Sequence, residues 1–154
     1  MKHQRFFTIL LSAVLCSLLL GVPFSSCTSK GEQLETCVDS FAQAYFRWQF
    51  LKAVRNCDAE SYRWISFVAS QVTQADVDSL RERRDDIDCT IGNAHLLNDS
   101  MAVVEVDVSH FLRMDSLGRA TFVEQKSTYC IPAILRNGFW RVSMREVLRP
   151  KKND

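Results

Sequence analysis

The strongest constraint on how this chain can fold is a change in the spacing of its apolar residues near position 88. Before that position, apolar side chains recur every three to four residues, which is the period of an amphipathic α-helix. From Asp88 onwards they alternate with polar ones, as Val104, Val106 and Val108 do with the residues between them. That alternation is the period of a strand with one buried face. Helices followed by strands predict an α+β fold with helices packed on one antiparallel sheet.

The first predicted helix covers residues 37–56 and carries a wide apolar stripe. Asp39 or Ser40 is expected to cap it. One of its faces comprises Phe41, Tyr45, Trp48, Leu51 and Arg55. A long helix of this kind is expected to lie across the concave face of the sheet.

Two shorter helices are expected after it. A turn at 56–58 leads into the second, over residues 59–68. Thr73, with Asp76 three residues later, resembles a weak capping box, which predicts a third helix ending near residue 84. Three N-terminal helices therefore precede the sheet.

Four strands are expected in the second half of the chain, at residues 88–97, 101–114, 120–135 and 139–147. Turn sequences separate them, and the last is an Asn-Gly hairpin turn at Asn137 and Gly138. Strands joined by short turns pair antiparallel, so the expected sheet is a four-stranded meander. Residues 149–154 are polar and are expected to form a frayed tail.

The N-terminus has the build of a secretory signal peptide. Lys2, His3 and Arg5 form a positive start, and residues 6–22 are apolar apart from three hydroxyl residues. That stretch is short for a membrane helix of about 20 residues, and Pro23 interrupts it. Cleavage is therefore favoured over a retained N-terminal anchor helix.

Cys27 follows this segment directly. Ser25, Ser26 and Cys27 resemble the lipobox of bacterial lipoproteins, although Phe24 stands where that pattern usually has Leu. The resemblance implies cleavage after residue 26 and acylation of Cys27 with palmitate-like chains. Two or more acyl chains hold a protein stably on a membrane. Ordinary secretion with cleavage near Ser26 is the alternative.

The lipobox resemblance also implies a location and a domain order. Thr28 follows the cysteine, and the absence of an Asp there favours the outer membrane, with its periplasmic and surface faces both open. The order is a signal peptide over 1–26, a lipidated cysteine and flexible polar tether over 27–36, and a domain over 37–148. The protein is thus expected in the cell envelope.

The charge of the exported part excludes one class of partner. Removal of residues 1–26 leaves 128 of the 154 residues, and because Lys2 and Arg5 leave with no acid, the formal charge falls from +1 to −1. A near-neutral domain of this kind is not built to bind nucleic acid through charge. Its length suits one domain.

Four cysteines remain besides Cys27: Cys37, Cys57, Cys89 and Cys130. Disulfides among these four cysteines are plausible because the domain is expected to be exported. The alternative is that all four are buried free thiols. If one continuous helix joins Cys37 to Cys57, they lie roughly 30 Å apart, too far for a bond that needs Cα atoms within about 7 Å. Cys37 would then pair with Cys89 or Cys130, and Cys57 with the other. Zinc-ligand spacings such as CxxC are absent, so no metal site is expected.

Several of these features together resemble one superfamily over residues 37–148. They are the long first helix, the turn Asn56-Cys57-Asp58 and the final hairpin Asn137–Val142, in this order along the chain. The pattern resembles the nuclear-transport-factor-2-like (NTF2-like) superfamily, a cone-shaped α+β fold. Small exported lipoproteins with this fold often have a Gly-Asp turn, where Cys57 here replaces the glycine. The superfamily contains enzymes, binding proteins and assembly partners, so the resemblance implies the fold without a function.

The resemblance implies an interior that is open at one end and lined by the first helix and the inner sheet face. Candidate pocket-lining residues, chosen by their place on helix and strands, are Tyr45, Trp48, His95, His110, Tyr129 and Trp140. Enzymes of this superfamily often place an Asp/His or Asp/Tyr pair there for proton transfer. Asp107 has the wrong strand parity to meet His110, and capping accounts for Asp39 and Asp58. No catalytic residue is assigned.

These observations favour a non-enzymatic, lipid-anchored module that binds a protein partner or a small apolar ligand. No cofactor or metal is expected. The alternative is a small cone-fold enzyme of lyase, isomerase or hydrolase type that acts on a hydrophobic substrate. It would need an inward carboxylate within hydrogen-bond reach of His95, His110 or Tyr129.

A homodimer formed through the outer face of the sheet is a third hypothesis. The residues expected on that face are Glu105, Asp107, Arg141, Ser143 and Arg145. Such a polar face argues against a large apolar interface.

Overall fold

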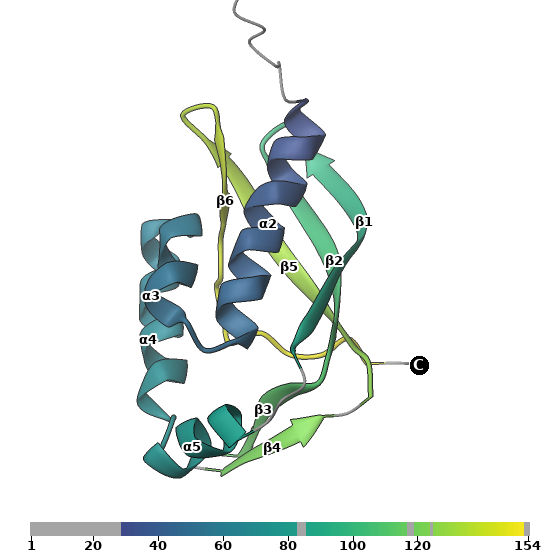
Figure 1. Ribbon diagram of the computed structural model, residues 1–154. Coiled ribbons are helices and arrows are strands. Elements are labelled where there is room, and N and C mark those ends of the chain that lie inside the picture. Colours follow the sequence, from purple (N-terminus) through teal and green to yellow (C-terminus); the bar gives the residue numbers. More distant parts are fainter. Residues whose placement is uncertain (1–28, 83–85, 117–118, 124, 153–154) are drawn as a thin grey trace, which may run out of the picture.

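The computed structural model describes residues 29–82, 86–116, 119–123 and 125–152. The chain folds as an α+β domain in which helices pack on a curved four-stranded antiparallel sheet, with a two-stranded hairpin at one end (Figure 1). The predicted fold class is therefore confirmed. The predicted signal peptide and Cys27 lie outside the described residues.

The helices differ from prediction mainly in their bounds. They are α2 (Lys30–Phe46), α3 (Phe50–Ala53), α4 (Tyr62–Ser70) and α5 (Gln74–Glu82), with 3₁₀ turns η1 (Val54–Asn56) and η2 (Ala59–Ser61). The capping box before α5 is present, because the Thr73 amide donates to Asp76 Oδ2 at 2.9 Å and the Asp76 amide donates to Thr73 Oγ1 at 3.3 Å.

Helix α2 begins at Lys30 rather than at Cys37, so most of the predicted flexible tether is helical. Ser29 caps it by accepting a hydrogen bond from the Glu32 amide at 3.2 Å. Leu34 is buried, which ties this first turn to the core. Asp39, predicted as a cap, instead lies in the middle of the helix.

The predicted 37–56 helix is broken after Phe46. The Trp48 amide donates to the Tyr45 carbonyl at 3.0 Å and the Gln49 amide to the Ala44 carbonyl at 2.8 Å, which is a Schellman motif. Trp48 occupies its left-handed position, with φ 57°. Glycine is usual there because a side chain in this conformation costs about 1 kcal/mol or more. The chain reverses at this point.

The reversal lays α3 and η1 beside α2. It therefore brings Cys37 close to Cys57, the pair that the sequence analysis excluded on the premise of one continuous helix. The Cys37 thiol donates to the Asn56 carbonyl, with sulfur and oxygen 3.6 Å apart, and Asn56 directly precedes Cys57. The premise of one continuous helix is therefore wrong, and Cys37 and Cys57 are neighbours.

The main sheet has the order β1-β2-β5-β6, and β3 pairs with β4 in a separate hairpin. The strands are β1 (Asp88–Asn98), β2 (Met101–Ser109), β3 (Phe111–Ser116), β4 (Arg119–Val123), β5 (Ser127–Arg136) and β6 (Phe139–Val142). His110 splits the predicted 101–114 strand, because its φ of 57° turns the chain away from the sheet. The predicted 120–135 strand is likewise divided between β4 and β5.

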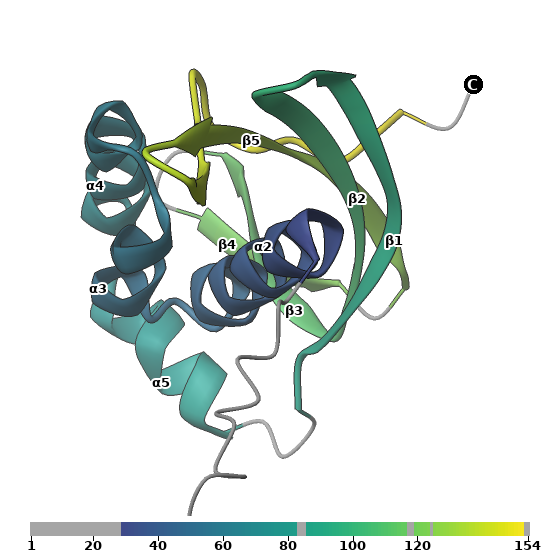
Figure 2. The same cartoon turned by 90° about the horizontal axis from the view of Figure 1, so that it is seen from above.

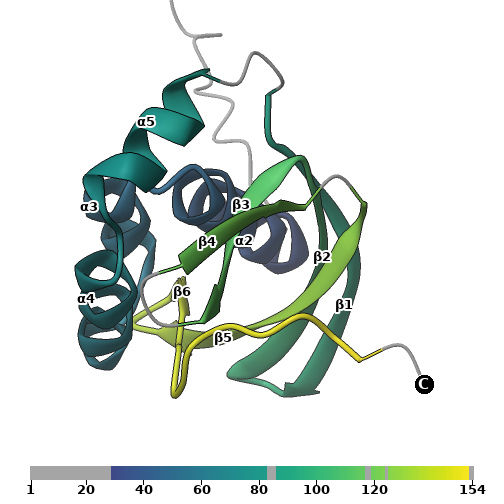
Figure 3. The ribbon, with the colours of Figure 1, turned by 90° about the horizontal axis from the view of Figure 1, so that it is seen from below.

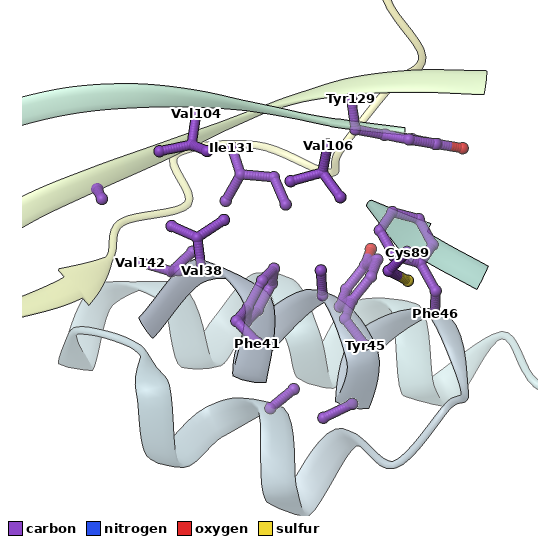
Figure 4. Packing of buried hydrophobic residues seen from close by; sticks show 14 of the residues in the cluster. Val38, Phe41, Tyr45, Phe46, Cys89, Val104, Val106, Tyr129, Ile131 and Val142 are labelled. Carbon is purple, nitrogen blue, oxygen red and sulfur yellow. The ribbon is translucent and has the colours of Figure 1, made fainter. Parts of the chain in front are cut away.

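The core lies between α2 and the inner sheet face (Figures 2 and 4). Val38, Phe41 and Tyr45 of α2 point toward strand residues whose side chains are also buried, namely Val104, Val106, Ile131 and Val142. Each fully buried side chain of this size contributes about 1.5–3 kcal/mol. Helix α2 and its strands thus form the rigid part of the domain.

The C-terminal segment is bound rather than frayed at its start. Tyr129 and Pro150 form an isolated antiparallel bridge, and the Lys151 amide donates to the Thr128 carbonyl at 2.7 Å. Lys151 also contacts Glu105 at 2.6 Å. Residues 147–152 therefore return to the sheet and take part in the structure described next.

Candidate functional site

A cavity of about 610 Å³ lies at the C-terminal end of α2. Its walls come from α2, α3, α4, β3, β5 and the C-terminal segment. The lining residues are Tyr45, Phe46, Trp48, Phe50, Phe67, Val68, Gln71, Phe111, Leu112, Arg113, Met114, Tyr129, Val147, Leu148, Arg149, Pro150 and Lys152. Figure 3 views the molecule from this end, where β3 and β4 lie below α2.

Aromatic rings in mutual contact form the cavity wall. Phe46 packs on Tyr129 and Phe111, with ring centroids 4.7 Å and 5.4 Å apart. Tyr45 packs edge-on against Phe46 at 5.2 Å. All four residues are buried, so their rings hold one another in place. The cavity is therefore preformed and mostly apolar, as small-molecule sites usually are.

Trp48 completes this wall from an unusual backbone position. Its ring stacks on Phe50, with centroids 6.5 Å and planes 22° apart. The Schellman turn could use glycine without strain, yet this chain has a half-buried tryptophan there. Strained backbone positions cluster at binding and catalytic sites, so Trp48 is the strained position nearest to this cavity wall that a test of binding should change.

The polar groups of the cavity carry positive charge. Arg113, Arg149 and Lys152 line it, together with Gln71. Among the described residues that line the cavity there is no Asp, Glu or His. The described lining therefore presents cationic side chains and no carboxylate or imidazole that could act as a general base.

Tyr45 is likewise unsuited to act as a base. Burial, together with the nearby Tyr129 and Cys57, raises the pKa of Tyr45 above its ordinary value. Its hydroxyl therefore stays protonated at neutral pH.

The structure brings three of the six candidate pocket residues together. Tyr45, Trp48 and Tyr129 line the cavity. His95 and His110 are exposed and outside the lining, since His110 lies at the turn into β3. Trp140 is buried at the opposite end of α2, where its Nε1 donates to the Lys30 carbonyl at 3.0 Å.

Sequence reasoning missed the contributions of α4, β3 and the C-terminal segment. Leu112 and Met114 were assigned to a continuous second strand, so their turn toward the cavity was not foreseen. Val147 and Leu148 are an apolar pair next to a basic tail, and this signal could have indicated a buried contact.

A separate polar cluster beside the cavity has a structural role. Asp58 caps η2, because its Oδ1 accepts from the Ser61 amide at 3.0 Å and from the Ser61 hydroxyl at 2.6 Å. Its Oδ2 accepts from the Ser143 hydroxyl at 2.7 Å. The Met144 amide donates to Ser61 Oγ at 2.8 Å. These bonds join the turn before α4 to the edge of the sheet after β6.

The four cysteines of the domain are free thiols. Cys130 is exposed and pairs in register with Glu105 on the outer sheet face, whereas Cys37, Cys57 and Cys89 lie on the helix side. Cys130 therefore lies on the opposite face of the sheet from the other three cysteines, and the predicted disulfide pairings stay predictions. Burial raises the pKa of Cys37 and raises that of Cys57 to about 12 and of Cys89 to about 11.

Among the described residues, no group of three or more His, Cys, Asp or Glu side chains is arranged to hold a metal ion. None of the helices in the same ranges is long and apolar enough to cross a membrane.

Comparison with known proteins bears on the fold. No protein-family model matches the chain, and no curated protein is similar to it. A candidate NTF2-like transpeptidase from Campylobacter jejuni is similar in structure, with 19% identity and a TM-score of 0.44 over 76% of this chain and 100% of that one. A candidate calcium/calmodulin-dependent protein kinase II association domain from Xanthomonas campestris has 17% identity and a TM-score of 0.43, over 77% and 91%.

At such identities and TM-scores the likeness concerns the general fold alone. No activity, ligand or partner passes from either protein to this chain.

Proposed function

We propose that this protein is a lipoprotein of the bacterial cell envelope that binds, without turnover, a small apolar ligand with an acidic end group. One observation carries the ligand part of the proposal. The aromatic cavity has a volume of about 610 Å³, and its charged lining side chains among the described residues are the cations Arg113, Arg149 and Lys152. Cavities of about 300–1,000 Å³ are the usual size for small-molecule sites.

The preformed wall supports binding of an apolar body. Each methylene removed from water contributes about 0.8 kcal/mol, which corresponds to about a fourfold gain in affinity. The affinity of straight-chain ligands should therefore rise about fourfold per added methylene until the cavity is filled.

The cationic groups support recognition of an acid. Arg149 and Lys152 come from the C-terminal segment and Arg113 from β3, so they approach the cavity from different elements. An anion near such groups gains charge-assisted hydrogen bonds that a neutral ligand does not. The lack of a carboxylate or histidine among the described lining residues favours binding over the enzyme alternative.

Isothermal titration calorimetry with straight-chain carboxylic acids and the matching alcohols tests both halves of the proposal. The acids should bind more tightly than the alcohols. Arg149→Gln with Lys152→Gln should reduce that difference, because only Arg113 of the three cations remains, while leaving alcohol binding unchanged. Leu51→Ala is the matched control, because Leu51 is 85% exposed and does not line the cavity. Equal affinity for acids of all chain lengths would refute the cavity as the binding site.

The anchor is proposed from the sequence, through the lipobox-like run that ends at Cys27. The intact mass of the protein extracted from its membranes tests it. We expect the mass of a chain that begins at Cys27 and carries acyl chains. The mass of an unlipidated chain that begins at another residue would refute the anchor and leave the cavity proposal standing.

A further inference from the structure

We propose that the end of the domain opposite the cavity lies against the lipid surface, so that the cavity opens away from the membrane. This membrane-facing end consists of the start of α2 and the tips of the β1–β2 and β5–β6 hairpins. The inference rests on the proposed acylation of Cys27.

The first argument is the length of the connection. Only Thr28 and Ser29 separate Cys27 from the start of α2 at Lys30. Consecutive Cα atoms are 3.8 Å apart and an extended chain spans at most about 3.6 Å per residue, so the Cα atoms of Cys27 and Lys30 lie within about 11 Å of each other. The headgroup layer of one leaflet is itself about 5–8 Å thick. An acylated Cys27 therefore holds the start of α2 at the lipid surface.

The second argument is which parts of the sheet lie beside the start of α2. Trp140 at the beginning of β6 donates from Nε1 to the Lys30 carbonyl at 3.0 Å. Leu135, which pairs with Trp140, donates from its amide to the Ser100 carbonyl in the β1–β2 turn at 2.8 Å. Figure 1 shows both hairpin tips at the end where α2 begins.

The third argument is the exposure of large apolar side chains at these tips. Leu96, Leu97 and Phe139 are 68%, 61% and 65% exposed, and Met101 is 44% exposed. Leu96 pairs with the buried Ala102 and lies on the inner face, whereas Phe139 precedes the buried Trp140 and lies on the outer one. Single exposed apolar residues are ordinary. Four at one end of the domain, around both sides of the sheet, form a tip suited to dip into lipid.

Charge at this end neither drives nor opposes the contact. The exposed charged residues near the tips are two cations and two anions, namely Lys30, Arg136, Glu32 and Asp99. Binding strength at a membrane surface then depends on buried apolar area rather than on anionic lipid.

The orientation decides how a ligand reaches the cavity. Helix α2 has 17 residues, which at 1.5 Å per residue makes it about 25 Å long. The cavity is at its C-terminal end, with Phe46, and the membrane-facing end is at its start. A ligand would therefore enter from the aqueous side or from another protein, rather than directly from the bilayer.

Quenching of added tryptophans by brominated lipid tests the orientation in the full, acylated chain bound to phosphatidylcholine vesicles. Leu97→Trp and Phe139→Trp should lose most of the added emission when brominated phosphatidylcholine replaces the ordinary lipid. Leu51→Trp is the matched control on α3, where Leu51 is 85% exposed, and its added emission should be unaffected. Equal quenching at 51, 97 and 139 would overturn the inference.

Three other outcomes are distinguishable. Blue-shifted emission at 97 and 139 without quenching would show that protein, such as a second copy of the chain, covers the tips, and would overturn the lipid contact. An intact mass without acyl chains would overturn the anchor and the orientation together. An acylated protein that shows no quenching at the tips overturns the orientation alone.

Discussion

Ser61→Ala should destabilise the domain far more than its small size suggests. Ser61 is fully buried; its hydroxyl donates to Asp58 Oδ1 at 2.6 Å and accepts from the Met144 amide at 2.8 Å. Loss of a hydrogen bond to a charged group costs about 1.5–3 kcal/mol, and an unsatisfied buried amide costs about 1–3 kcal/mol. The two effects overlap in one network, so we expect a loss of about 3 kcal/mol in the free energy of unfolding.

Urea unfolding followed by circular dichroism measures this loss. The midpoint should fall while the slope with denaturant stays unchanged, because the surface exposed on unfolding is the same. Ser70→Ala is the matched control, since the Ser70 hydroxyl also donates to a carbonyl, at 2.7 Å, but in an exposed setting. It should change stability by less than about 0.5 kcal/mol. A Ser61→Ala loss below about 1 kcal/mol would refute the role given to this network.

The stability difference between the wild-type protein and Ser61→Ala should depend on pH, because the Ser61 hydroxyl donates to the ionisable Asp58. Burial by itself would raise the pKa of Asp58, but hydrogen bonds from Ser61 and Ser143 outweigh it and lower the pKa below its ordinary value. A lowered folded-state pKa gives stability that is present above the unfolded value of about 3.9 and lost as pH falls through the folded one. The difference between wild type and Ser61→Ala should therefore shrink below about pH 4.

Three further changes test other parts of the structure. In the folded mature chain with Cys27→Ser, a disulfide reagent at pH 8 should modify Cys130 quickly and Cys89 only on unfolding, because Cys130 is exposed whereas Cys89 is buried with a pKa of about 11. Rapid modification of both cysteines, measured by mass spectrometry, would contradict the burial of Cys89. Trp48→Gly should keep stability within about 1 kcal/mol, since glycine relieves the left-handed strain, yet lower ligand affinity in calorimetry more than about tenfold, the loss expected for one aromatic anchor. Phe41→Ala should cost about 3–5 kcal/mol in urea unfolding, because its ring is fully buried; a loss under about 1 kcal/mol would contradict the packing of α2 on the sheet.

Much of the architecture followed from local pattern. The change of apolar period near residue 88 predicted helices before strands, and the capping pair Thr73 and Asp76 marked the start of α5. These features are readable because the period and the cap depend on neighbours a few residues away. The Asn-Gly turn before β6 was predicted for the same reason, and Asn137 and Gly138 both have positive φ.

Two of the errors came at backbone positions that carry no local signal. Trp48 and His110 both have φ near 57°, a conformation that glycine usually takes and that side chains such as these rarely adopt. Each was therefore interpreted as the middle of a regular element. Contacts distant in sequence, such as the stacking of Trp48 on Phe50 and the packing of Phe111 on Tyr129, accompany these turns in the fold.

The sequence by itself determined the fold class, the order of the elements and the lipobox-like run at Cys27, because each is written in residues close together along the chain. Only the tertiary structure decided where the cavity lies, which residues line it, and which end of the domain would adjoin the proposed anchor. Those properties depend on the reversals at Trp48 and His110 and on the return of residues 147–152 to the sheet. The cavity lining thereby combines residues about a hundred positions apart, such as Phe46 and Leu148, and local periodicity carries no information about such long-range neighbours.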